Sequence, residues 1–194
     1  MRQPPVSRLR PFARRFLRVE RGATAVEFAL VSLPMLVMVF GLLELARVFL
    51  VGLTLDNATQ IASRQIRTGE FQTSGGTSKA NFKTLVCSNM SWLQSKCTAD
   101  LWLDVQTFAN FSDLAAAPSP ASTTFNPNTL CFSAGQPTDI VLVRAFFEWD
   151  LFTPLLDGAL ENMGGGSGKR LISSTTAFRN EPFNTTPPVG AKCT

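Results

Sequence analysis

Glu27 is an acidic residue near the start of an otherwise apolar run, and its spacing from Gly22 and Ala23 could support a specific chemistry. A carboxylate inside a membrane segment costs about 2.5–3.5 kcal/mol at the bilayer centre, so it should have a partner. If the chain is cut after Gly22, Ala23 gains a free ammonium group one helical turn before Glu27. Glu27 could then pair with its own N-terminus or with that of a neighbouring copy. In the second case the charge would be satisfied only when the two helices pack in the correct register.

The remaining polar residues do not form a recognisable catalytic or metal-binding pattern. The chain has no histidine, and histidine is both the commonest general base and the commonest metal ligand. The segment 163–170 (MGGGSGKR) has Met163 where a phosphate-binding loop has glycine, and Arg170 where such a loop has Ser or Thr. We therefore interpret it as a flexible connection and predict no enzymatic activity, no cofactor and no metal site. Acidic residues that could include an acid/base pair, but that more often occupy solvated faces and turn caps, are Asp100, Asp104, Asp139, Glu148, Asp150, Asp157 and Glu161.

The four cysteines all follow the apolar run. They are Cys87, Cys97, Cys131 and Cys193. An even number of cysteines in an exported region indicates disulfides. Four cysteines allow three pairings; we favour Cys87–Cys97, which are close in sequence, and therefore Cys131–Cys193.

A membrane span is the strongest feature of the N-terminal region. Sixteen residues without a charge run from Phe28 to Leu43, and counting back to Ala23 gives twenty-one, close to the roughly 20 that a span needs. Pro34 and Gly41 interrupt the run, and Pro34 predicts a kink or local loosening. The alternatives are a cleaved signal peptide, which fits poorly because the run is long and no cleavage site follows it, and a buried core helix.

The charge distribution predicts the orientation of this span. Residues 1–22 contain seven of the eighteen basic residues and one of the fourteen acidic ones, so the rest of the chain has a net charge of −2. The positive-inside rule then places residues 1–22 in the cytoplasm and the C-terminal body outside. The body has no basic stripe, which argues against nucleic-acid binding.

The N-terminal block resembles a known signal. Gly22, Ala23, Glu27 and Phe28 followed by an apolar helix resemble the class III signal of type IV pilins, and the pattern G-x-x-A-V-E-F-A (22–29) is similar to that of the TadE-like minor pilins, or pseudopilins, of the tight-adherence (Flp/Tad) pilus. The stretches IASRQIRTGEFQ (61–72) and TTAFRNEPF (175–183) support the resemblance. It implies that a prepilin peptidase cuts after Gly22, and that Glu27 directs assembly together with Phe28. The major Flp pilin is little more than the helix, so this longer chain resembles a minor component.

We expect an α+β fold with three regions. Residues 1–22 form a cleaved cytoplasmic leader, 23–68 a long helix that spans the membrane in its first half, and 69–194 an extracytoplasmic domain. Within 42–67 we expect Glu44 to pair with Arg47, and one small-to-apolar face. In the domain we expect a helix over 78–95 capped by Ser78, strands over 100–108, 139–151 and 169–180 in an antiparallel sheet, a loop over 114–129, and one or two helical turns in 151–163. The residues expected on the helix face are Leu45, Val48, Phe49, Gly52, Leu55 and Ala62.

These features together predict a non-enzymatic minor pilin that takes part in assembling, priming or capping a Flp/Tad-type pilus and so supports surface adhesion. Its expected partners are prepilin peptidase, other pilins through the helix, and the inner-membrane assembly platform. It would reside in the bacterial inner membrane and enter the pilus. The alternative is a membrane-anchored periplasmic or pilus-tip adhesin, in which Trp92, Trp102 and Trp149 could form an exposed ligand patch; we expect them in an aromatic core instead.

Overall fold

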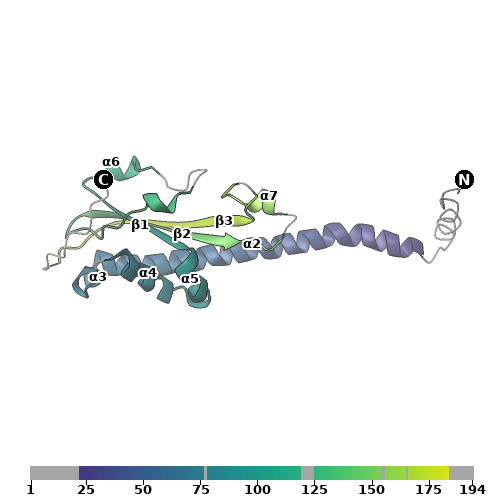
Figure 1. The fold of residues 1–194 in the computed structure, drawn as a ribbon, viewed down its shortest axis with the longest axis horizontal. Helices are drawn as coiled ribbons and strands as arrows, with labels where there is room; N and C mark the ends of the chain where they lie inside the picture. The colour runs from purple at the N-terminus through teal and green to yellow at the C-terminus, as the bar shows by residue number, and fades with distance from the viewer. Residues whose placement is uncertain (1–21, 77, 119–124, 154–155, 165, 184–194) are drawn as a thin grey trace, which may run out of the picture. The chain divides into compact units, whose positions relative to one another are not determined.

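The computed structural model describes residues 22–76, 78–118, 125–153, 156–164 and 166–183. The fold is α+β, as predicted: a long N-terminal helix, short helices and one antiparallel sheet (Figure 1). The predicted leader apart from Gly22, and Cys193, lie outside the described residues. The chain divides into two compact units, and the boundary between Leu43 and Glu44 lies inside the long helix.

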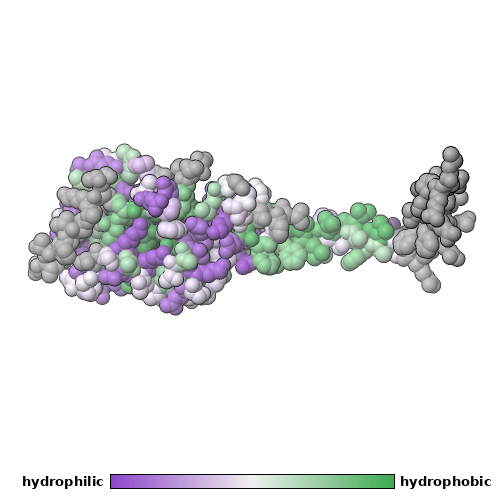
Figure 2. Space-filling model, viewed as in Figure 1, coloured by the Kyte–Doolittle hydropathy of each residue, from purple (hydrophilic) through white to green (hydrophobic). Residues whose placement is uncertain are grey.

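The long helix α2 spans Ala23–Arg67 and runs through Pro34 without a break in its helical assignment. Its part in the first unit has the length and apolar composition to cross a membrane, and it exposes large apolar side chains such as Phe28, Leu30 and Val31 (Figure 2). Side chains this apolar do not remain in water by preference, which agrees with a segment surrounded by lipid or by other apolar helices.

The second half of α2, in the second unit, buries one face against the body. Val51, Leu55, Ala58, Ala62 and Ile66 are fully buried there, at the spacings of three and four residues that place side chains on one side of a helix. The predicted face was therefore right for Leu55 and Ala62. It was wrong for Leu45 and Phe49, which are exposed because they lie on the helix outside the stripe of buried residues.

The sheet contains β1 (Leu101–Phe108), β2 (Ile140–Asp150) and β3 (Lys169–Arg179), in the order β1-β2-β3. All three predicted strands are confirmed within one residue at each end. Alternate side chains of β2 join the core formed with α2: Val141, Val143, Ala145, Phe147 and Trp149. The intervening residues face the other side, where Leu130, Phe146 and Leu171 form a smaller cluster. The central strand is almost entirely buried because both faces are covered.

A buried ion pair organises the second face of the sheet. Asp104 and Arg144 are direct cross-strand partners, and the Arg144 Nη2 to Asp104 Oδ2 distance is 2.6 Å. Arg144 also donates to the Pro118 carbonyl, and Asp104 accepts from the Cys131 backbone amide. Each charge is thus satisfied by several hydrogen bonds, which burial requires. The pair attaches both ends of the 118–131 connection to the sheet.

The helical region before β1 is more broken than predicted. Ser78 caps α4 (Lys79–Ser88) by accepting from the Asn81 amide, which confirms the predicted start. The helix then stops, and a 3-10 turn (η3, Ser91–Leu93) and α5 (Gln94–Asp100) follow. Ser91 has a positive φ of 48°, so the chain turns there and cannot continue as one helix. Other short elements are α3 (Glu70–Thr73), α6 (Phe111–Ala115), η4 (Pro127–Thr129) and α7 (Asp157–Leu160), of which only α7 was expected.

The turn between α4 and α5 is closed by a disulfide. Cys87 and Cys97 are bonded, with their Cα atoms 5.5 Å apart, as predicted. Both residues belong to the core that also contains Phe82, Val86 and Met90. Cys131 is not a free cysteine, but its predicted bridge to Cys193 involves a residue outside the described part and stays a prediction.

Replacing Cys87 and Cys97 together by alanine is expected to lower the free energy of unfolding by about 2–5 kcal/mol, because the unfolded chain gains freedom and two buried sulfurs are lost. Urea unfolding of the full chain in detergent, followed by circular dichroism, measures the change. Thr84→Ala, on the exposed side of α4, is the control and should shift the midpoint little. An unchanged midpoint in the double variant would contradict a structural role for this bridge.

Candidate functional site

Gly22 occupies a helical turn directly before α2, and nothing in the described part of the fold requires glycine there. A Cβ atom at this position would meet no atom of the described chain within 4 Å. Gly22 is also absent from the glycines with positive φ. Since neither space nor backbone conformation explains the glycine, a requirement for it would have to come from a molecule that binds this segment.

Glu27 and Phe28 lie on the exposed surface of α2, in the first unit. Phe28 is 73% exposed. Among the described residues, Glu27 has no hydrogen bond and no ion pair. Its carboxylate is therefore available for a partner that the described chain does not supply. Both sequence hypotheses, pairing with its own N-terminus after cleavage and pairing with a neighbour's, remain predictions.

The structure brings together the two outlying stretches of the sequence pattern, 61–72 and 175–183. Arg67, the last residue of α2, forms an ion pair with Glu181 at 3.1 Å. The Glu181 backbone amide also donates to the Arg67 carbonyl at 2.9 Å. The backbone bond satisfies a carbonyl that the end of a helix leaves without an intrahelical partner. We call this contact the helix-end clamp; it comprises Arg67, Gly69, Gln72, Asn180, Glu181 and Phe183.

Glycine is required in the clamp for two reasons. Gly69 has a φ of 76°, and a Cβ atom there would lie 2.5 Å from the Phe183 ring. The buried side-chain amides of Gln72 and Asn180 both donate to the Ala134 carbonyl. These bonds attach the connection before β2 to the helix-end clamp. The two motif stretches are thus explained by mutual packing, and a sequence pattern alone did not reveal that they meet.

Gly69→Ala is expected to destabilise the body by about 1–3 kcal/mol, because alanine disfavours a positive φ and its Cβ would collide with Phe183. Gly164→Ala is a matched control, since Gly164 has the same φ of 76° but nothing within 4 Å of the added Cβ. Thermal unfolding of the two variants isolates the Phe183 contact. Equal losses would show that the clamp adds nothing beyond backbone strain.

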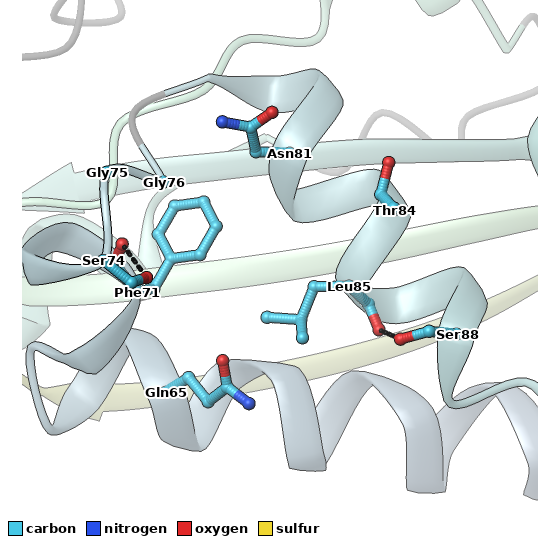
Figure 3. Close-up of a pocket in the computed structure, with 9 residues that line it drawn as sticks. All are labelled: Gln65, Phe71, Ser74, Gly75, Gly76, Asn81, Thr84, Leu85 and Ser88. Atoms are coloured by element: carbon cyan, nitrogen blue, oxygen red, sulfur yellow. Dashed lines mark hydrogen bonds between the residues drawn. The ribbon is translucent and has the colours of Figure 1, made fainter.

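A surface pocket of about 360 Å³ lies between the end of α2, α3 and α4 (Figure 3). Its lining combines the apolar side chains of Phe71 and Leu85 with hydroxyls and amides. The Ser74 and Ser88 hydroxyls donate to the carbonyls of Phe71 and Leu85. None of its lining residues is ionisable, so the pocket offers hydrogen bonds and apolar contact but no acid, base or charged nucleophile.

Five of the seven acidic residues considered for catalysis make structural contacts: Asp104, Asp139, Glu148, Asp150 and Glu161. Asp104 is in the buried ion pair, and Asp139 accepts from the Gln136 amide at 2.8 Å. Glu148 accepts from Trp102 Nε1 and from Lys169 Nζ, and this hydrogen bond raises the pKa of Lys169. Within the described ranges, no group of three or more His, Cys, Asp or Glu side chains could hold a metal ion.

Glu161 makes hydrogen bonds to the glycine-rich segment. Its two carboxylate oxygens accept from the amides of Gly166 and Gly168, at 3.2 and 3.1 Å. The glycine pattern did not indicate these two bonds.

The expected pairing of Glu44 with Arg47 was wrong. In the described chain no ion pair joins them. Glu44 is 2% exposed and accepts from the Phe152 amide and the Thr153 hydroxyl, at 3.1 and 3.3 Å. Arg47 lies over the rings of Trp149 and Phe152. The end of β2 and the segment after it supply these partners, which are more than a hundred residues away in sequence.

Comparison with known proteins agrees with the sequence pattern. Residues 22–64 match the family model described as TadE-like protein. No match is found among curated proteins or solved structures. The matched segment begins at Gly22, includes Glu27 and Phe28, and ends three residues before the last residue of α2. Over residues 22–64, about a fifth of its length, the chain is therefore similar to the TadE-like proteins.

Proposed function

We propose that this chain is a non-enzymatic minor pilin, or pseudopilin, that takes part in assembling, priming or capping a Flp/Tad-type pilus. The observation that carries the proposal is the match over residues 22–64. The first part of this segment is an exposed apolar helix whose Glu27 carboxylate has no partner among the described residues. An exposed apolar helix suits packing beside other helices of the same kind in a membrane or a fibre.

Cleavage by a prepilin peptidase would separate this helix from the basic leader. Gly22 directly precedes Ala23, where α2 begins, and the fold itself places no demand on glycine there. Cleavage after Gly22 would create an ammonium group one helical turn from Glu27. Pairing across neighbouring subunits would then link processing to assembly, since only a cleaved subunit could offer the positive charge.

The orientation follows from the charges. Seven basic residues precede the apolar segment, and such residues stay on the cytoplasmic side of a bacterial inner membrane. The body would then lie in the periplasm, where the Cys87–Cys97 disulfide is stable. Contacts of the body with other pilins or with the assembly platform would follow from this location.

The surface pocket beside α4 favours a second candidate, a membrane-anchored binding protein or tip adhesin. The two candidates differ in processing. A plain anchor needs no cleavage, whereas a pilin must be cut before it enters a fibre.

N-terminal sequencing of the protein from membranes and from sheared surface pili tests the proposal. We expect the sequence to begin at Ala23 in both fractions. A protein that still begins at Met1 while pili are assembled would contradict the pilin function and leave the anchored binding protein.

A further inference from the structure

Five side chains from three separate segments form an aromatic and cationic cluster on the second unit. The Arg47 guanidinium carbon is 5.5 Å from the centre of the Trp149 ring and 5.4 Å from that of Phe152. Lys96 Nζ is 5.4 Å from the centre of the Trp149 ring, and Trp92 meets the same ring edge-on at 6.2 Å. We call Arg47, Trp92, Lys96, Trp149 and Phe152 the aromatic cluster.

The cluster is attached to the chain where the apolar segment ends. Arg47 follows Leu43 by four residues, or about 6 Å along the helix axis. Glu44, the first residue of the second unit, accepts from the Phe152 amide. The Leu151 amide donates to the Gly168 carbonyl at 2.8 Å. These two bonds fix the backbone of the segment that presents Phe152 beside the first helical turn after Leu43.

The segment from Ala23 to Leu43 is about as long as the hydrocarbon core of a bilayer is thick. Its twenty-one residues span about 32 Å, and the hydrocarbon core is about 30 Å thick, so the turns after Leu43 lie at the level of the headgroups. The next turns of α2 continue the apolar surface, since Phe49 is 67% exposed and Leu45 is half exposed. The two charges in these turns are not directed at the lipid: Glu44 is buried and accepts two hydrogen bonds through Oε2, and Arg47 lies on aromatic rings. The boundary between the hydrocarbon core and the headgroups can therefore lie at the level of the aromatic cluster.

Two rings of the cluster are exposed. Phe152 is 73% exposed and Trp92 is 50% exposed, while Trp149 lies buried behind them. Aromatic rings accompanied by cations are the side chains that favour the headgroup region of a bilayer, because the ring enters the boundary and the charge remains hydrated. Lys96 is paired with Asp150 at 3.3 Å, so the surface has little net charge and does not require anionic lipid.

From these observations we propose that the aromatic cluster contacts the phospholipid headgroups at the C-terminal end of the span and seats the body on the membrane. Glu44 acts as a positioning residue, because its carboxylate holds the backbone of Phe152. The inference rests on the membrane insertion contained in the proposed function, but not on cleavage or on pilus assembly.

Tryptophan fluorescence of the full chain in phosphatidylcholine vesicles tests the contact. Trp102→Phe leaves Trp92 and Trp149 as the reporters, both within the cluster. Phosphatidylcholine that carries a nitroxide on its headgroup is expected to lower their emission about twofold, as for tryptophans at the membrane interface. Adding Arg47→Ser and Phe152→Ser should remove most of this quenching. Phe111→Ser is the matched control, since Phe111 is also exposed but follows the opposite end of β1, and should leave the quenching unchanged.

Flotation of the chain with the vesicles is measured first, so that a failure of membrane insertion can be distinguished from a failure of the headgroup contact. A chain that does not float contradicts membrane insertion and with it the proposed function. A chain that floats without quenching overturns only the headgroup contact. Quenching that survives Arg47→Ser and Phe152→Ser would also overturn it. The headgroup contact would also be overturned if the nitroxide does not quench the tryptophans and acrylamide quenches them only at low protein density. In that case a neighbouring protein, and not lipid, would cover the cluster.

Discussion

Replacing Gly22 by arginine is expected to leave the chain at its full length, with Met1 as its N-terminus. The physical reason is external to the fold. A Cβ atom at position 22 would meet no atom of the described chain within 4 Å, so a larger residue there is expected to leave folding and membrane insertion unaffected. A peptidase that accepts only the smallest residue before the cut would be blocked by the larger side chain.

Gly158→Arg is the matched control for this experiment. Gly158 is exposed in α7, and a Cβ atom there also meets nothing within 4 Å, so the same charge is added to the second unit and not to the segment that contains the cut site. Intact mass and N-terminal sequencing of membrane-extracted protein distinguish precursor from mature chain. Normal processing of the Gly22 variant would contradict cleavage at this position, whereas a defect shared by both variants would indicate a general loss of folding.

Removing the carboxylate of Glu27 should abolish incorporation into pili while leaving the two earlier steps intact. Glu27→Ala eliminates the cost of an acid in an apolar segment, so insertion should be kept or improved. Cleavage should also continue, because Gly22 and Ala23 are unchanged. In the assembled fibre, however, a neighbour's ammonium would have no partner. An unpaired charge in such surroundings costs roughly 2.5–3.5 kcal/mol, equivalent to about a hundredfold in the association constant.

Three quantities from one strain test this expectation: the membrane fraction, the ratio of precursor to mature chain, and the protein recovered in sheared pili. Glu27→Gln should resemble Glu27→Ala in assembly, because it keeps the size but not the charge. Glu70→Ala is the control, since Glu70 is an exposed acid that follows α2. Loss of insertion would assign Glu27 a different role, and normal incorporation of both Glu27 variants would refute pairing between subunits.

Features with a local physical cause could be predicted from the sequence. The helix from Ala23 to Arg67 follows from its composition and from Gly69, which stops it. Ser78 is recognisable as a helix cap because its hydroxyl accepts a hydrogen bond from the backbone amide three residues ahead. The three strands follow from runs of β-branched and aromatic residues. The apolar run from Phe28 to Leu43 predicted a membrane-spanning helix for the same reason, since length and absence of charge are properties of the segment alone.

Tertiary structure alone decided which distant residues meet. Glu44 was expected to pair with Arg47 because they are three residues apart, but its partners are Phe152 and Thr153, which the turn after β2 delivers. Arg67 and Glu181 are 114 residues apart, and no local pattern encodes such a contact. Asp104 was read as a solvated carboxylate; the register that places it opposite Arg144 buries it instead. Local sequence determines propensity and periodicity, whereas the partner of a buried charge depends on how the sheet pairs and which face of α2 it covers.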